Sequence, residues 1–192
     1  MLAGKVALIT GASSGIGAST AVLFAKLGAN LSLTGRNMEN LERTLQSCQL
    51  TESQKKPLLI QADLSSEEDT SKLVEKTVAE FGKLDILVNN AGVLEMGTIE
   101  NTSLDQYDRV MNVNVRAIYQ LTMLATPELV KTKGNIVNVS SVNGIRSVCV
   151  HICLLNRSIE FIKLYCVTEV SRCPGLQYFQ GCFGSVHAMR CS

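Results

Sequence analysis

The chain has 192 residues, 46% of them apolar and 18% charged, which is enough for one globular domain with a single core but too little for two. Eighteen Lys and Arg residues against seventeen Asp and Glu residues give a formal net charge of +1, so charge gives no reason to expect nucleic acid or an anionic membrane surface as a partner. No run approaches the ~18 apolar residues of a membrane helix, and the first residues do not resemble a secretory leader, so we expect a cytoplasmic protein.

The first 140 residues alternate short apolar runs with amphipathic stretches. The runs predict strands at residues 6–10, 31–34, 58–62, 85–89 and 135–140. The stretches between them predict helices at residues 16–27, 37–49, 65–81 and 104–130. This alternation favours an α/β fold in which helices cover both faces of a parallel sheet.

Two features predict where helices begin and end. Gly28 is a suitable residue for the end of the first helix, and Ser65 with Glu68 matches a capping box before the third. The buried face expected for that third helix consists of Leu73, Val74, Thr77, Val78 and Phe81.

A glycine-rich turn joins the first strand to the first helix, with the sequence Thr10-Gly-Ala-Ser-Ser-Gly-Ile-Gly17. Glycine allows unusual dihedral angles and close approach of a pyrophosphate, and a helix N-terminus offers unpaired N–H groups with a positive dipole end. The turn therefore predicts a phosphate site, the alternative being a tight turn that only serves packing.

The spacing Gly-x-x-x-Gly-x-Gly resembles that of the short-chain dehydrogenase/reductase family in its single-domain form. Four further motifs agree in order and in element: Asp63-Leu64, Asn89-Asn90-Ala91-Gly92, Asn112-Val113-Asn114 and Asn138-Val139-Ser140-Ser141. The resemblance covers residues 1 to about 147 and implies a Rossmann-type doubly wound parallel sheet, truncated after the fifth strand.

The resemblance implies hydride exchange between a nicotinamide and a small carbonyl or secondary alcohol substrate. The implied cofactor-binding residues are Gly11, Ser13, Ser14, Gly15, Ile16, Gly17, Arg36, Asp63, Leu64, Asn90, Ala91 and Gly92. Ser141 would polarise the substrate oxygen, and Asn114 would hold a water or a helix carbonyl in a proton relay. Arg36 follows the second strand, at the position where an acid would bind the ribose of NAD(H) and a basic residue would bind the 2′-phosphate of NADP(H). NADP(H) is therefore preferred, and NAD(H) is possible. The alternative is that Arg36 is only a solvated surface arginine.

The family's acid/base tyrosine and its lysine are missing from the positions that the motif predicts. Leu154 lies thirteen residues after Ser141, and Ser158 lies four residues later. Tyr165 does not replace the tyrosine, because Glu169 stands where the lysine belongs and a carboxylate would raise a phenol pKa. We therefore expect impaired or no turnover.

The regular pattern ends near residue 148. Residues 148–192 are rich in cysteine, have no clean helical or strand period, and are not expected to form a domain, so the predicted domain is 1–147. A metal site is not expected, since no Cys-x-x-Cys pair exists, and neither is a disulfide framework, since the seven cysteines are an odd number.

One hypothesis explains this tail. With suitable codons, residues 171–182 read one base later encode Pro-Gly-Val-Leu-Ala-Tyr-Asn-Ile-Ser-Lys-Ala, which contains the missing Tyr-x-x-x-Lys. Residues 148–192 would then be a retained intron followed by an out-of-frame exon.

Truncation after the fifth strand has two expected consequences. The strand at 135–139 would be an unpaired apolar edge, and the homo-oligomer usual for the family would lack part of its surface. Three functions stay open: an NADP(H)-dependent oxidoreductase, a non-catalytic dinucleotide-binding fragment, and an unstable product without a role.

Overall fold

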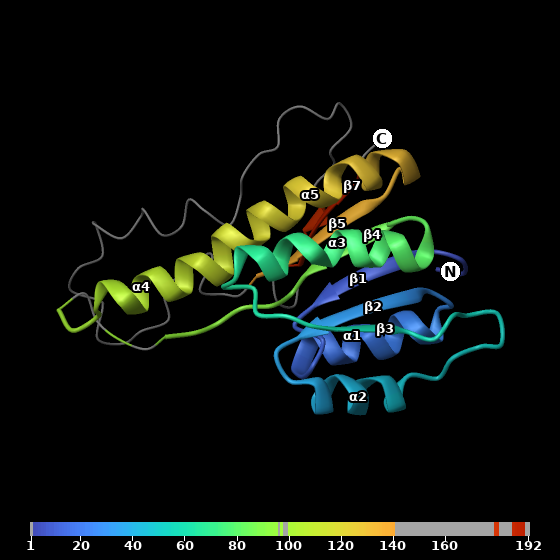
Figure 1. The fold of residues 1–192 in the computed structure, drawn as a ribbon, viewed down its shortest axis with the longest axis horizontal. Helices are drawn as coiled ribbons and strands as arrows, with labels where there is room; N and C mark the ends of the chain where they lie inside the picture. Colours follow the sequence, from blue (N-terminus) through green and yellow to red (C-terminus); the bar gives the residue numbers. More distant parts are fainter. Residues whose placement is uncertain (1, 96, 98–99, 141–178, 181–185, 191–192) are drawn as a thin grey trace.

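The computed structural model describes residues 2–95, 97, 100–140, 179–180 and 186–190. The elements follow the predicted alternation (Figure 1). They are β1 (Val6–Thr10), α1 (Gly15–Lys26), β2 (Asn30–Gly35), α2 (Met38–Ser47), β3 (Leu58–Gln61), α3 (Glu67–Phe81), β4 (Ile86–Asn89), α4 (Leu104–Met111), the π-helix η1 (Asn112–Arg116), α5 (Ala117–Thr132), β5 (Asn135–Val139), β6 (Phe179–Gln180) and β7 (Val186–Arg190).

The sheet has the strand order β3-β2-β1-β4-β5-β7-β6, and its first five strands are parallel. Helices α1 and α2 lie on one face, and α3 and α5 lie on the other (Figure 1). The predicted doubly wound parallel sheet is confirmed. Because parallel strands end at the same edge, the turns after β1, β2 and β4 meet at the carboxyl edge of the sheet.

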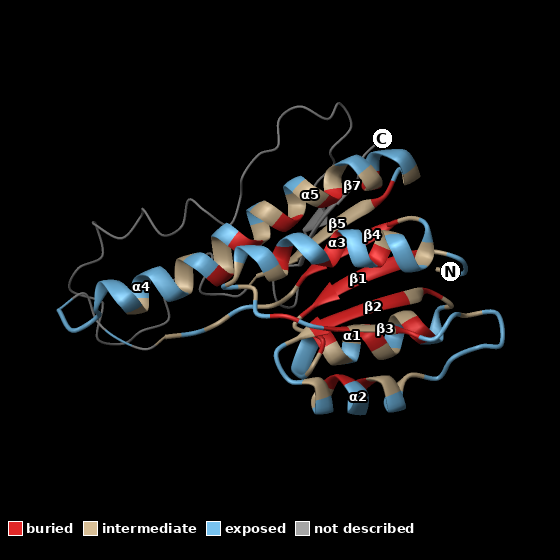
Figure 2. Cartoon of the chain, in the orientation of Figure 1, coloured by how far each residue is buried: buried red, intermediate tan, exposed pale blue. Residues whose placement is uncertain are grey.

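The core lies on both faces of the three central strands. Every residue of β1 and β4 is buried, as are the four inner residues of β2 (Figure 2). Ile9 and Leu33 pack on the α1 side, whereas Leu8 and Leu87 pack beneath α3 and α5. Burial on both faces explains why these strands are continuous apolar runs in the sequence.

The expectation that β5 is an unpaired edge is wrong. β7 pairs antiparallel with β5, with Asn135 opposite Arg190 and Val139 opposite Val186. The free N–H and C=O groups of an apolar edge strand are a template for any further strand, which is the physical reason for the pairing. The parallel part of the sheet still ends at β5, as predicted.

The predicted capping box is displaced by one residue. Ser66, not Ser65, caps α3, and its Oγ accepts the Asp69 N–H at 3.2 Å. The apolar period nevertheless identified the face, because Leu73, Val74 and Thr77 are buried, whereas Val78 and Phe81 of the predicted face are half-buried. Sequence pattern fixes the face of a helix better than its first residue, since neighbouring serines compete for the cap.

The long helix predicted at 104–130 is continuous in direction but changes hydrogen-bonding pattern at η1. The segment Asn112–Arg116 is a π-helix between α4 and α5. α4 extends away from the sheet at one end of the molecule and buries none of its residues (Figures 1 and 2).

The small residues of α1 face the sheet. Gly17, Ala21 and Ala25 are buried, whereas Leu23 and Leu27 are exposed. Small side chains let α1 approach β1 and β2 closely. The helix starts at the carboxyl edge of the sheet because only a short turn separates it from the end of β1.

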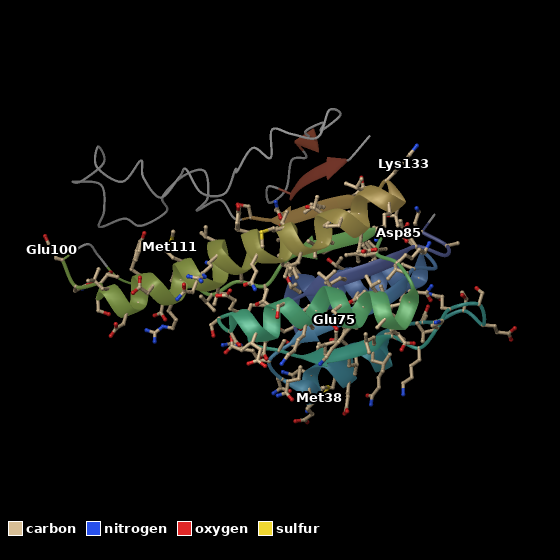
Figure 3. All side chains as sticks on the ribbon, turned by 45° about the horizontal axis from the view of Figure 1, so that its top comes forward. Met38, Glu75, Asp85, Glu100, Met111 and Lys133 are labelled. Atoms are coloured by element: carbon tan, nitrogen blue, oxygen red, sulfur yellow. The ribbon has the colours of Figure 1, made fainter. Side chains whose placement is uncertain are left out.

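A buried carboxylate holds the opposite end of the sheet together. Asp85, labelled in Figure 3 and 2% exposed, accepts Lys5 Nζ at 2.7 Å, the Val6 N–H at 3.0 Å and Lys83 Nζ at 3.1 Å. Burial alone would raise the pKa of Asp85, but these three donors outweigh it and hold the pKa below its ordinary value.

None of the described helices is long and apolar enough to cross a membrane.

Candidate functional site

The turn between β1 and α1 has the backbone conformation that its glycines predict. Gly11 and Gly15 have φ angles of +64° and +55°, in the left-handed region that favours glycine. Gly17 has no such angle, but a Cβ added there would collide with the Gly11 carbonyl group and with Asn90 Nδ2. The third glycine is therefore required by packing between the turn and the loop after β4.

The N-terminus of α1 is available for an anion. Ser14 is the N-cap in an extended conformation, but its side chain makes no capping hydrogen bond, and the first turn contains no acidic residue. The first N–H groups of a helix have no partner within it, and they carry the positive end of the helix dipole. The residues present therefore fit a pyrophosphate.

The loop after β4 is fixed to this turn by two residues. Asn90 Nδ2 donates to the carbonyl oxygens of Thr10 at 2.9 Å and of Gly11 at 3.2 Å. Thr10 Oγ1 accepts the N–H groups of Asn90 at 2.9 Å and Ala91 at 3.0 Å, and it donates to the Val88 carbonyl oxygen at 3.2 Å. The Asn90 side chain therefore holds the loop after β4 against the glycine turn, and Ala91 and Gly92 follow Asn90 in that loop.

Sequence reasoning missed Thr10 as a site residue. The only signal in the sequence was that Thr10 directly precedes the first glycine of the turn. Its hydrogen-bond partner, Asn90, lies 80 residues away in the sequence. A local pattern does not reveal such a partner.

Arg36 follows β2 at the carboxyl edge of the sheet, directly after Gly35. A Cβ on Gly35 would stand 3.0 Å from Ser13 Oγ, so Ser13 covers the residue just before Arg36. Arg36 is exposed and, within the described part of the chain, forms no ion pair; the nearest acid along the sequence, Glu39, pairs with Arg43 instead. The structure thus leaves the Arg36 guanidinium free to meet an anionic ligand.

Asp63 and Leu64 follow β3 at the same edge. Asp63 Oδ1 accepts the Ser65 N–H at 2.9 Å, which fixes the exposed carboxylate in a tight turn. Leu64 is half-buried and borders a cavity of about 240 Å³, whose far wall includes Asn112 and Arg116.

Asn114 lies in the π-helix η1 and clamps the loop after Gly92. Its Oδ1 accepts the Val93 N–H and its Nδ2 donates to the Val93 carbonyl oxygen, both at 2.8 Å. The side chain is thus occupied by Val93, and the proton-relay role of Asn114 stays a prediction.

A polar pair, the buried Asn89 and the half-buried Asn138, joins β4 to β5. Asn89 Nδ2 donates to Asn138 Oδ1 at 2.8 Å and to Thr122 Oγ1 at 3.3 Å. Ser141, which would follow this pair, lies outside the described residues, as do Leu154, Ser158, Tyr165 and Glu169. Two buried oxygens of the described residues, Asn89 Oδ1 and Thr34 Oγ1, have no hydrogen-bond partner.

The described residues hold no group of three or more His, Cys, Asp or Glu side chains placed to bind a metal ion. Cys48 is half-buried, and burial raises the pKa of its thiol.

Comparison with known proteins gives consistent matches. A family model described as short chain dehydrogenase matches residues 5–153. The 3-oxoacyl-(acyl-carrier-protein) reductase FabG of Thermotoga maritima is 37% identical over 145 residues, which are 75% of this chain and 58% of that protein. The 11-beta-hydroxysteroid dehydrogenase-like 2 of Arabidopsis thaliana is 41% identical over 143 residues, covering 74% of this chain and 46% of that protein.

Two solved structures share the fold. The apo-form glucose dehydrogenase of Caenorhabditis elegans matches with a TM-score of 0.66 and 43% identity, covering 74% of this chain and 56% of that one. The 3-ketoacyl-(acyl-carrier-protein) reductase of Brucella melitensis, complexed with NADH, matches with a TM-score of 0.69 and 37% identity, covering 77% and 61%. The chain thus spans about half to three fifths of the length of these relatives.

Proposed function

Because this chain belongs to the short-chain dehydrogenase family, we propose that it binds a nicotinamide dinucleotide at the carboxyl edge of its sheet. The observation that carries the proposal is the close packing of Gly11, Gly17 and Asn90, where a Cβ added to either glycine would collide with its neighbours. This cradle lies beside the N-terminus of α1, which has no side-chain cap. Gly11, Ser13, Ser14, Gly15, Ile16 and Gly17 would surround the diphosphate.

We propose NADP(H) as the preferred form of the cofactor. A 2′-phosphate carries negative charge, and the exposed Arg36 guanidinium, which forms no ion pair within the described residues, would bind it, whereas NAD(H) recognition relies on an acid at this position. Asp63 and Leu64 would contact the adenine, and Ala91 and Gly92 would line the path toward the nicotinamide.

The proposed reaction class is oxidoreduction of a carbonyl or secondary alcohol, with the nicotinamide supplying or accepting the hydride when it is bound. Ser141 would hydrogen-bond the substrate oxygen, and Asn114 would hold the loop at Val93 in place. With Leu154 and Ser158 at the positions of the acid/base pair, the proton has no donor there. A missing general acid commonly costs ~100- to 10,000-fold in rate.

A second candidate function follows from that substitution. A chain that keeps the dinucleotide cradle but has leucine for the proton donor would act as a non-catalytic dinucleotide-binding fragment. The two candidates differ in turnover and share the binding site.

Two measurements on the full chain separate the oxidoreductase from the binding fragment. The first is a fluorescence titration with NADPH, and the second is an NADPH-consumption assay with small aldehydes and ketones. Saturable binding with turnover supports the oxidoreductase, and saturable binding without turnover supports the binding fragment. Folded protein with no affinity for NADPH or NADH would refute both and leave the unstable or inactive product.

A further inference from the structure

A buried hydrogen bond from Thr44 joins α2 to the glycine turn. α2 lies beside α1 on one face of the sheet (Figure 1), and Thr44 is one of the buried residues of α2. Thr44 Oγ1 donates to the Ala12 carbonyl oxygen at 2.9 Å, and it also lies 3.1 Å from the carbonyl oxygen of Asn40 in its own helix. The turn between β1 and α1 is therefore held from α2 as well as from the loop after β4.

Ala12 is held at both of its backbone groups. Its N–H donates to the Thr34 carbonyl oxygen on β2 at 2.9 Å, and its own carbonyl oxygen accepts the Thr44 hydroxyl. Ala12 is fully buried and stands between Gly11 and Gly15, which both have positive φ angles. Because glycine leaves the backbone many conformations, the shape of this turn depends on hydrogen bonds from outside it.

The bond from Thr44 sets the direction of the peptide group between Ala12 and Ser13. This peptide group is trans, so its C=O and its N–H point in opposite directions. With the Ala12 oxygen turned toward the buried Thr44, the Ser13 N–H points away from α2. A carbonyl oxygen turned toward a diphosphate would repel it, whereas a backbone N–H attracts it. The Thr44 bond therefore gives the turn a polarity that suits an anionic ligand.

Packing alone does not hold the turn against α2 at this point. A cavity of about 430 Å³ lies between α1 and α2, and Ser13, Val22 and Thr44 are among the residues that line it. Side chains at the border of a cavity have partner atoms on fewer sides than those in a filled core. The direction of the Ala12–Ser13 peptide group therefore depends on the hydroxyl of Thr44 more than on its methyl group.

We propose that Thr44 is a positioning residue for the nicotinamide dinucleotide and that it acts on the ligand through Ala12 and Ser13. This inference rests on the proposed function, because it assigns a role in binding at the same turn. Without the hydroxyl, the buried Ala12 oxygen loses its donor and the peptide group turns toward another partner. The binding-competent form of the turn then becomes a fraction of the population, which weakens the apparent affinity by that fraction.

The test is fluorescence titration of the full chain carrying Thr44→Val with NADPH and with NADH. Valine has nearly the shape of threonine but no donor, so we expect the Kd of each dinucleotide to rise roughly five- to tenfold. Both should weaken alike, since both carry the diphosphate. Thr44→Ser keeps the hydroxyl, and its Kd values should return to within about twofold of those of the unmodified chain. Thr44→Ala, which favours the helix, should weaken binding as valine does and replaces that variant if valine impairs folding.

Thr77→Val is the matched control. Thr77 on α3 is also buried, and it donates to Ser32 Oγ at 2.8 Å and to the carbonyl oxygen of Leu73 in its own helix at 2.7 Å. It thus combines a long-range bond with a bond one helical turn away, as Thr44 does, but on the other face of the sheet. Thr77→Val should lower the midpoint of denaturant unfolding and leave both dinucleotide affinities unchanged.

The outcomes distinguish this inference from the proposed function. Equal affinities of Thr44→Val and the unmodified chain would overturn the inference alone. An equal loss of affinity in Thr77→Val, or no recovery in Thr44→Ser, would also overturn it, because the effect would then be a general loss of stability. A folded unmodified chain that binds neither dinucleotide would refute the proposed function, and this inference with it.

Discussion

Asn90 donates its side-chain amide to the Thr10 carbonyl oxygen at 2.9 Å, and this bond joins two loops that lie 80 residues apart in the sequence. The same amide nitrogen fills the space where Gly17 would otherwise carry a side chain. The proposed cofactor cradle is therefore an assembly of three parts, the glycine turn, the start of α1 and the loop after β4.

Gly17→Ala should disrupt this assembly. The added Cβ would overlap the Gly11 carbonyl, which is backbone, and the Asn90 amide, so the turn must shift. Overpacking of this kind costs about 1–3 kcal/mol of unfolding free energy, and we expect NADPH affinity to fall at least tenfold. Chemical denaturation and fluorescence titration measure the two effects.

Gly4→Ala is the control for Gly17→Ala. Gly4 has a φ of +73° but nothing within 4 Å of an added Cβ, so the change costs about 1 kcal/mol of stability through backbone strain alone. Its NADPH affinity should equal that of the unmodified chain. Equal affinity in the Gly17→Ala variant would contradict the assignment of this turn as the cradle.

Arg36→Glu should reverse the preference between the two dinucleotides. Loss of one charge-assisted contact costs about 1.5–3 kcal/mol, which is ~10- to 100-fold in NADPH affinity, while a carboxylate could accept a ribose hydroxyl of NADH. Arg43→Gln is the control, since Arg43 pairs with Glu39. An Arg36→Glu variant with unchanged NADPH affinity would show that Arg36 is only a solvated side chain.

The sequence identified the elements and missed the tertiary partners. The apolar run Val6–Thr10 predicts β1, because a strand that is buried on both faces needs apolar residues at consecutive positions. The brace between Thr10 and Asn90 depends on which strands are adjacent, so no local pattern contains it. The β5–β7 pairing was missed for a similar reason, because the segment around Val186–Arg190 follows a tail without periodicity.

Thr10 and Thr34 lie opposite each other on β1 and β2, are equally buried, and should respond oppositely to valine. Thr10→Val leaves the Asn90 and Ala91 N–H groups without their acceptor, at about 1–3 kcal/mol for each group that stays buried and unpaired. Thr34→Val removes a buried hydroxyl that has no partner, so stability should be unchanged or increase. Denaturant unfolding of both variants measures the contrast, and equal losses would contradict it.

Asp85→Asn should destabilise the fold at neutral pH by about 2 kcal/mol, because the charged bonds from Lys5 and Lys83 are lost. The pKa of Asp85 is lowered in the folded state, so its stabilising contribution is fully present above the ordinary carboxyl pKa. The contribution is lost as pH falls through the folded pKa.

The free energy difference between the unmodified chain and Asp85→Asn should therefore shrink as the solution is made acidic from pH 7 to below the ordinary carboxyl pKa. Glu39→Gln removes an exposed ion pair and should change stability little at any pH. A difference for Asp85→Asn that stays constant with pH would show that the carboxylate charge is not what stabilises this end of the sheet.

The hypothesis about the tail makes a prediction about the transcript. If residues 171–192 are translated one base out of register, Leu176 and Gln180 must be encoded by codons whose shifted reading gives tyrosine and lysine. With residues 148–170 removed and one residue bridging the junction, that tyrosine falls thirteen positions after Ser141.

Sequencing the messenger RNA checks the codons and the splice junction directly. A second transcript with the shifted frame should then encode a chain that turns over NADPH. Codons that cannot encode the tyrosine and lysine would refute the hypothesis and leave residues 148–192 as a genuine alternative ending.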